Sequence, residues 1–199
     1  MIQGVDLSHY QGDVNWTKVA QGIKFAYIKA TEGSMNIDPK FKENWGGAYD
    51  VGVPVGAYHF FDPSQDSGMQ AEHFCDTLDT VTGKRLPPVL DIEKTGGVSQ
   101  ALILLKVCNW LNAVEKHTKQ QPVIYTNPSI ASQIRLAKRF SGYKLWIAQY
   151  GVKSPTLSGW DDWTFWQYSQ TGKLSGVNGN VDLDYFNGTI AELHALLGG

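Results

Sequence analysis

Short, β-branched apolar runs alternate with helical patterns along this sequence, and the alternation restricts the folds it can adopt. Eight runs have the length and composition of strands, at residues 2–7, 24–30, 53–60, 88–93, 122–126, 145–150, 164–168 and 180–183. Between them, apolar residues recur at helical spacing at Ala71, Phe74, Cys75, Leu78 and Val81, and at Ala101, Leu104, Leu105, Cys108, Leu111 and Val114. Ser99 is the expected N-cap of the second helix. This order favours a parallel β/α arrangement closed into a barrel.

The length of the chain indicates that this barrel is irregular. A chain of 199 residues is expected to form one compact domain. A regular eight-fold barrel typically needs ~250 residues. After residue 137 the helical pattern nearly disappears until residues 190–197, while Trp, Tyr, Gly and Asn become frequent. We therefore expect a single α/β domain over residues 1–199, whose last strands lack full helices.

Charge and hydropathy argue against several classes of partner. The net charge is −2 and no cluster of Lys and Arg occurs, so a nucleic-acid surface is not expected. No run of 18 apolar residues occurs, and residues 1–16 lack the basic and apolar regions of a secretion signal. We expect neither stable membrane association nor an ordinary secretion signal. Cys75 and Cys108 fit neither a disulfide framework nor a paired zinc pattern and are expected to be incidental.

Two acids at the end of one strand are the first candidates for chemistry. In Pro88–Glu93, Asp91 and Glu93 are separated by one residue, so the period of two directs both side chains to the same face. Two adjacent carboxyl groups titrate as a coupled pair, which keeps one of them protonated near neutrality. Such a group could act as a general acid and protonate a glycosidic oxygen. The alternative is a solvated pair that ends the strand, or an ion pair with Lys94 or Lys29.

Two further acids lie in the first and last strands. Asp6 ends the first strand and Asp182 lies in the last, and a barrel closes by pairing these two strands. Both acids could therefore lie beside Asp91 and Glu93, at the carboxyl ends of the strands where β/α barrels carry their active sites. The alternative for Asp6 is an Asx turn, and for Asp182 a capped strand end.

Other catalytic chemistries lack their motifs. The sequence contains no Gly-x-Ser-x-Gly, no His-Glu-x-x-His and no Gly-x-x-x-x-Gly-Lys-Ser/Thr. Its five histidines show no ligand spacing, so no metal or cofactor is expected. His59 follows Tyr58 at a strand end and either touches the site or has a hydrogen-bonded structural role.

Seven segments resemble glycoside hydrolase family 25, the Chalaropsis-type lysozymes, in sequence and order. They are Gly4–Gly12, Tyr27–Gly33, Gly56–Phe60, Leu90–Glu93, Ile124–Asn127, Leu145–Tyr150 and Trp166–Leu183, so the resemblance covers nearly the whole chain. The resemblance implies an irregular (β/α)5β3 barrel. It also implies hydrolysis of the β-1,4 bond between N-acetylmuramic acid and N-acetylglucosamine in peptidoglycan. Many members carry a separate cell-wall-binding module, and we expect none within residues 1–199.

The resemblance also assigns roles to individual residues. It makes Glu93 the general acid and Asp91 its partner, with Asp6 and Asp182 as the remaining acids of the pocket. Tyr58, Tyr125 and Trp166 match positions that line the groove, while Lys29, Glu32 and Gln167 match polar positions at its rim.

Two mechanisms remain open from the sequence. In a substrate-assisted route, Glu93 protonates the leaving oxygen and the 2-acetamido oxygen of the sugar attacks, with Asp91 stabilising the cyclic cation. In an inverting route, Asp6 or Asp182 activates water, which needs about 6.5–9.5 Å between acid and base. We favour substrate assistance, because an Asp two residues before the acid is well placed to hold an acetamido group.

Three classes of function are weighed. A muramidase is favoured over a non-catalytic glycan-binding module, because every acid is retained. It is also favoured over a peptidoglycan amidase or peptidase, because no zinc or Cys/His constellation is found. We expect a monomer that is made in the cytoplasm. It would reach the wall as a phage endolysin, through a membrane pore, or as a bacterial effector, through a secretion machine.

Overall fold

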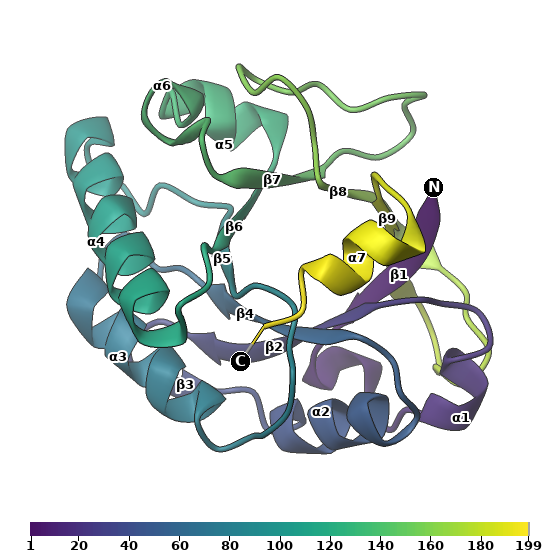
Figure 1. Ribbon diagram of the computed structural model, residues 1–199. Helices are drawn as coiled ribbons and strands as arrows, with labels where there is room; N and C mark the ends of the chain where they lie inside the picture. Colours follow the sequence, from purple (N-terminus) through teal and green to yellow (C-terminus); the bar gives the residue numbers. More distant parts are fainter. Residues whose placement is uncertain (199) are drawn as a thin grey trace.

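A closed barrel of eight strands forms the centre of the computed structural model, which describes residues 1–198 (Figure 1). The strands are β1 (Ile2–Leu7), β2 (Ala26–Glu32), β3 (Asn36–Ile37), β4 (Val55–Phe60), β5 (Val89–Ile92), β6 (Val123–Thr126), β7 (Lys144–Ala148), β8 (Phe165–Gly172) and β9 (Val181–Phe186). The helices are η1 (His9–Gln11), α1 (Trp16–Val19), α2 (Phe41–Asp50), α3 (Ser67–Leu78), α4 (Gln100–Thr118), α5 (Pro128–Gln133), α6 (Ala137–Phe140) and α7 (Ile190–Ala195). Each of the eight predicted strands is present, with no end shifted by more than four residues.

The barrel has the expected (β/α)5β3 order, with one strand in an unexpected direction. Its strands are ordered β1-β9-β8-β7-β6-β5-β4-β2, and β1 pairs with β2 to close it. All neighbouring pairs are parallel except β8–β9 and β9–β1. The parallel arrangement expected from the sequence therefore holds for every barrel strand except β9, which is antiparallel to both of its neighbours. The short connection from β8 to β9 contains no helix, and a parallel crossover would need a dozen or more residues.

Helices cover only part of the barrel wall. In Figure 1, α3 and α4 lie outside the strands on the left, α5 lies above them and α2 below, whereas no helix connects β7 to β8 or β8 to β9. The buried residues of α4 recur at helical spacing, from Ile103 and Val107 to Trp110 and Val114. Ser99 holds the N-cap position as predicted, although its side chain makes no capping hydrogen bond.

The interior of the barrel is filled by aromatic rings. Phe25 lies 5.2 Å from Phe165 and Tyr27 lies 4.9 Å from Trp146, measured between ring centroids. Gly4 on β1 makes this packing possible, because a Cβ atom there would lie 2.4 Å from the ring of Phe25. The rings close the barrel from within and form an apolar floor beneath its carboxyl end.

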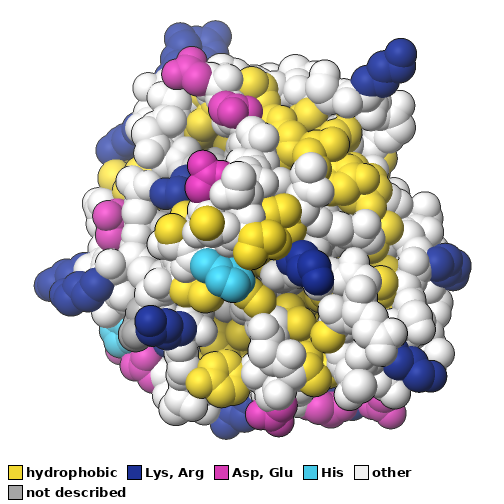
Figure 2. Space-filling model, turned by 45° about the vertical axis from the view of Figure 1, so that its right-hand side comes forward, with side chains coloured by type: hydrophobic (Ala, Val, Ile, Leu, Met, Phe, Trp, Pro, Cys, Tyr) yellow, Lys and Arg dark blue, Asp and Glu magenta, His cyan; other side chains and the backbone are white. Residues whose placement is uncertain are grey.

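The two cysteines and the surface charges follow the sequence analysis. Cys75 and Cys108 are free thiols in α3 and α4, as expected. On the face shown in Figure 2, charged side chains of both signs are dispersed and form no continuous basic patch. None of the helices in residues 1–198 combines the length and the apolar character that a membrane crossing requires.

Candidate active site

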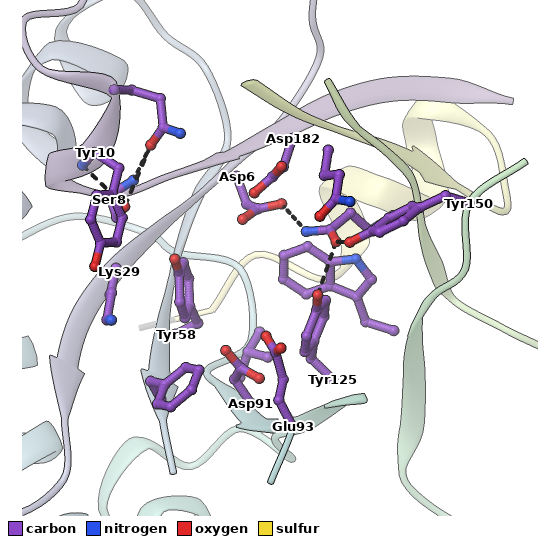
Figure 3. Close-up of a pocket in the computed structure, with 16 residues that line it drawn as sticks. Asp6, Ser8, Tyr10, Lys29, Tyr58, Asp91, Glu93, Tyr125, Tyr150 and Asp182 are labelled. Atoms are coloured by element: carbon purple, nitrogen blue, oxygen red, sulfur yellow. Dashed lines mark hydrogen bonds between the residues drawn. The ribbon is translucent and has the colours of Figure 1, made fainter. Parts of the chain in front are cut away.

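The barrel opens at the carboxyl end of its parallel strands into a polar cavity of about 240 Å³ (Figure 3). Alternation along the strands directs every second side chain inward, from Tyr27 to Lys29 on β2 and from Val89 to Asp91 on β5. The cavity is lined by Asp6, Ser8, Tyr10, Gln11, Lys29, Tyr58, Phe60, Val89, Asp91, Glu93, Tyr125, Trp146, Tyr150, Gln167, Gln170 and Asp182. All four acids that the sequence singled out are among these residues.

Asp91 and Glu93 form one wall of the cavity, where their carboxyl groups lie beside each other (Figure 3). Burial raises the pKa of Asp91 well above its ordinary value, and the charge of Glu93 raises it further. Loss of water around the Glu93 carboxyl also raises its pKa, although Asp91 and Lys29 oppose this rise. Asp91 is buried, whereas Glu93 as a residue is exposed at the pocket mouth. Burial therefore favours the protonated form of both carboxyl groups, and that of Asp91 most strongly.

Asp6 and Asp182 form the opposite wall, as Figure 3 shows. They are directly paired across β1 and β9, so closure of the barrel brings together residues 176 positions apart. Burial, and then Asp182, raise the pKa of Asp6, while burial and Glu93 raise the pKa of Asp182 to about 6. The sequence analysis placed Asp182 at the carboxyl end of its strand, but it lies at the start of β9. Because β9 is antiparallel, its start lies at the carboxyl end of the other strands.

Gln167 connects this wall to two tyrosines and does not lie at the rim, where the sequence analysis expected it. Its Nε2 donates to Asp6 Oδ2 at 2.7 Å, and its Oε1 accepts from the hydroxyl of Tyr125 at 2.9 Å. Tyr150 also donates to Oε1. Gln167 is only 3% exposed, so its amide is fixed by these three contacts. Its main role in this structure is to orient Asp6.

Lys29 is the positively charged side chain of the cavity lining. Its Nζ lies 2.7 Å from Glu32 Oε2 and 4.9 Å from the centre of the Phe60 ring. Glu32 itself does not line the cavity, so the expectation that it is a rim residue is corrected. Glu32 contacts the site through its ion pair with Lys29. The two residues are three positions apart at the end of β2.

Trp166 does not face the cavity, which corrects its expected place in the groove. It precedes Gln167 on β8, so alternation directs its ring to the outside of the barrel. There its indole N–H donates to the carbonyl of Gln149 at 2.8 Å, and the ring packs against Trp163 and Tyr185.

His59 also points outward and has the structural role. Its ring is fully buried, hydrogen-bonded to Thr31 and Gln70, and stacked on Trp110 at 5.5 Å between centroids. Burial lowers its pKa to about 3, so it is neutral.

Sequence analysis missed several residues of the lining. Tyr150 follows Trp146 and Ala148 at a period of two, which could have predicted its inward direction. Tyr10 lies in η1 at the rim, is 81% exposed and contacts His9 at 4.1 Å between ring centroids. Among residues 1–198, no three His, Cys, Asp or Glu side chains are arranged to hold a metal ion.

Comparison with known proteins decides the family. The family model described as "Glycosyl hydrolases family 25" matches residues 5–177. The chain belongs to this family. It is 40% identical to Lysozyme M1 of Streptomyces globisporus over 98% of this chain and 71% of that protein. It is 30% identical to the N,O-diacetylmuramidase of Chalaropsis sp., over 100% of both chains.

A solved family 25 structure confirms the fold. The bacterial lysozyme from Streptomyces coelicolor matches with a TM-score of 0.90 and 37% identity, over 98% of this chain and 96% of that one. The resemblance noted from the sequence is thus confirmed, and the protein is a glycoside hydrolase of the lysozyme family. A family of peptidoglycan-cleaving enzymes accounts for a barrel end that carries four carboxyl groups around an open pocket.

Proposed function

We propose that this protein is a 1,4-β-N-acetylmuramidase that cleaves the bond between N-acetylmuramic acid and N-acetylglucosamine, with Glu93 as general acid and then general base. The observation that carries the proposal is the pair of Asp91 and Glu93, whose carboxyl groups lie beside each other at the cavity wall (Figure 3). Glu93 is the member at the pocket mouth, where a leaving-group oxygen can approach it. Its raised pKa is the property that a general acid near neutrality needs.

Asp91 has an acceptor that suits a substrate amide. Its Oδ1 is buried and has no hydrogen-bond partner among residues 1–198. A buried acceptor without a donor is costly, by about 1–3 kcal/mol. The N–H of a 2-acetamido group would supply the missing donor. This contact would stabilise the Asp91 anion and favour a proton on Glu93. Glu93 would therefore be protonated and ready to act as the general acid only when the sugar is bound.

The same contact favours a substrate-assisted route. With its N–H held by Asp91, the acetamido group presents its oxygen to the anomeric carbon, and the cyclic cation that forms lies against the Asp91 carboxylate. Glu93 gives its proton to the leaving oxygen and later removes one from the attacking water. The first product then keeps the β configuration. Proton NMR of freshly released fragments tests this step, and an α anomer formed first would exclude it.

Replacement of Glu93 by glutamine tests the proposed role. The Glu93→Gln variant should fold and bind wall fragments but lose about 10²- to 10⁴-fold in turnover. Mass spectrometry of borohydride-reduced fragments from purified peptidoglycan identifies the bond: the wild type should yield reduced muramic acid ends. Glu72→Gln is the matched control, because Glu72 is exposed on α3 outside the cavity.

Each other outcome has a defined meaning. Reduced glucosamine ends would indicate the other glycosidic bond, and new amino termini an amidase or peptidase. Binding without any fragments would indicate a non-catalytic glycan-binding module. Wild-type turnover in Glu93→Gln would remove Glu93 from the acid role.

We also propose that the enzyme acts as a monomer in the lysis of a bacterial cell, as an endolysin or as a delivered effector. One chain supplies all four carboxyl groups of the pocket, which supports a monomer. Cleavage of peptidoglycan weakens the layer that resists turgor, which supports a lytic role. Cytoplasmic expression in a bacterium, with and without a co-expressed pore-forming protein, tests the endolysin route. Lysis only with the pore supports it, and no lysis in either culture opposes it.

A further inference from the structure

A fifth carboxyl group lies beneath the four acids of the pocket. Asp184 follows Asp182 by two positions on β9, so it points into the barrel one layer deeper. Its register partners are Gly4 on β1 and Gln167 on β8. It is fully buried and does not line the cavity, so no substrate group reaches it.

The contacts of Asp184 leave one oxygen without a donor. Oδ1 accepts from the indole N–H of Trp146 at 2.9 Å. Oδ2 has no hydrogen-bond partner among residues 1–198. Asp6 lies two positions from Gly4, the register partner of Asp184, and points to the same inner face, so the two carboxyl groups are diagonal neighbours. In the described part of the chain, no Lys, Arg or His forms an ion pair with Asp184.

One of two neighbouring buried carboxyl groups stays protonated, because two anions would repel each other and no cation of residues 1–198 lies nearby. We propose that Asp184 is a neutral carboxylic acid in the working enzyme and that its O–H donates to Asp6, which it holds as an oriented anion. Asp6 is the anionic member because it borders the cavity and receives the N–H of Gln167. Asp184 is a positioning residue, and the proposal rests on the muramidase function given above.

The surroundings of Asp184 support this assignment. The titratable groups that surround it are Asp6 on β1, Asp182 on β9 and Tyr27 on β2, and all three are acids. Burial is the largest cause that raises the pKa of Asp184, followed by the charge of Asp6. The N–H of Trp146 opposes this rise but is a single neutral donor.

An asparagine at this position tests the proposal, because it reproduces the neutral acid and not the anion. In Asp184→Asn the amide oxygen can accept from Trp146 and the amide N–H can donate to Asp6. We expect kcat/KM within about threefold of wild type and an unchanged acid limb of the pH profile. Asp184→Leu has a side chain with the same branching but no donor, and should lower kcat by about 10- to 100-fold while KM changes little.

An infrared measurement separates this proposal from the proposed function. At pH 8 the wild type should show carbonyl stretches of protonated carboxyl groups, to which Asp91 and Asp184 both contribute. In the wild type minus Asp184→Asn difference spectrum one such band should be lost, whether or not either protein cleaves peptidoglycan. Urea unfolding verifies that both variants fold. The proposal is overturned if the difference spectrum shows no lost band, if Asp184→Asn shifts the acid limb to lower pH, or if it loses as much activity as Asp184→Leu.

Discussion

Replacement of Gln167 by methionine removes the three hydrogen bonds that tie Asp6 to Tyr125 and Tyr150. The shape of the side chain is nearly preserved, so the change is mainly the loss of donors and acceptors. Tyr125 and Asp6 are buried and would be left without these partners. The hydroxyl of Tyr150 can turn to water, because this residue is 39% exposed.

The size of the effect follows from the number of groups that lose a partner in a dry environment. A buried polar group left unpaired costs about 1–3 kcal/mol, and two groups are affected. The free energy of unfolding of Gln167→Met should therefore fall by about 2–5 kcal/mol. Urea unfolding followed by tryptophan fluorescence measures this loss. Turnover should fall as well, because Asp6 loses the N–H that orients its carboxylate.

A second glutamine on the same strand provides the control. Gln170 also lines the cavity, but it is exposed. Gln170→Met should change the free energy of unfolding by less than about 0.5 kcal/mol. A loss below about 1 kcal/mol in Gln167→Met would refute the reasoning, because the network would then contribute little to folding.

Three further predictions follow from the same geometry. Burial raises the pKa of Asp182 to about 6 in the folded protein. Its ionisation therefore destabilises the folded state above pH 6, and this destabilisation is absent below about pH 4, where the group is protonated in the folded and unfolded states. Asp182→Asn should raise the free energy of unfolding by about 1–2 kcal/mol at pH 7, a value reduced for its partial exposure, and leave it unchanged at pH 3; a gain at both pH values would contradict this cause. In Trp166→Phe the hydrogen bond to Gln149 is lost, so the free energy of unfolding should fall by about 1 kcal/mol while kcat/KM is unchanged. A fall in kcat/KM would indicate that Trp166 lies in the groove after all. Tyr10→Ala should raise KM about 3- to 10-fold with kcat unchanged, if this exposed ring at the rim stacks on a sugar; an unchanged KM would exclude that contact.

The sequence was sufficient to predict the barrel and the position of its acids, for a physical reason. Strand periodicity is a local property, and it placed Asp91 and Glu93 on one face without knowledge of the rest of the fold. Barrel closure is a topological requirement, and it brought Asp6 to Asp182. Both inferences needed only the number of strands and the alternation within each.

Other features could not be read from local patterns. A six-residue strand such as β9 has the same composition in either direction, so its antiparallel course, and hence Asp182 at its start, were not visible. Alternation shows that Trp166 and Gln167 face opposite sides, but not which of them faces inward. In α4 two sets of apolar residues have helical spacing: the predicted set that includes Ala101 and Cys108, and the set that is buried, which includes Ile103 and Trp110. Only packing decides which face of an apolar helix is buried.

The position of the acids directly above the aromatic floor explains how one pocket keeps protons near neutral pH. The rings of Tyr27 and Trp146 exclude water from below, so each carboxyl group is solvated only from the cavity side. Depth then orders the groups: Asp184 is fully buried, Asp91 and Asp6 border the cavity, and Glu93 lies at its mouth. A bound sugar displaces cavity water and brings its own amide donor, so it acts most strongly on the groups that border the cavity. Proton transfer between Asp91 and Glu93 can therefore respond to substrate while Asp184 and Asp6 keep a fixed arrangement. This division requires that the acids cost folding energy, which the stability gain expected for Asp182→Asn measures directly.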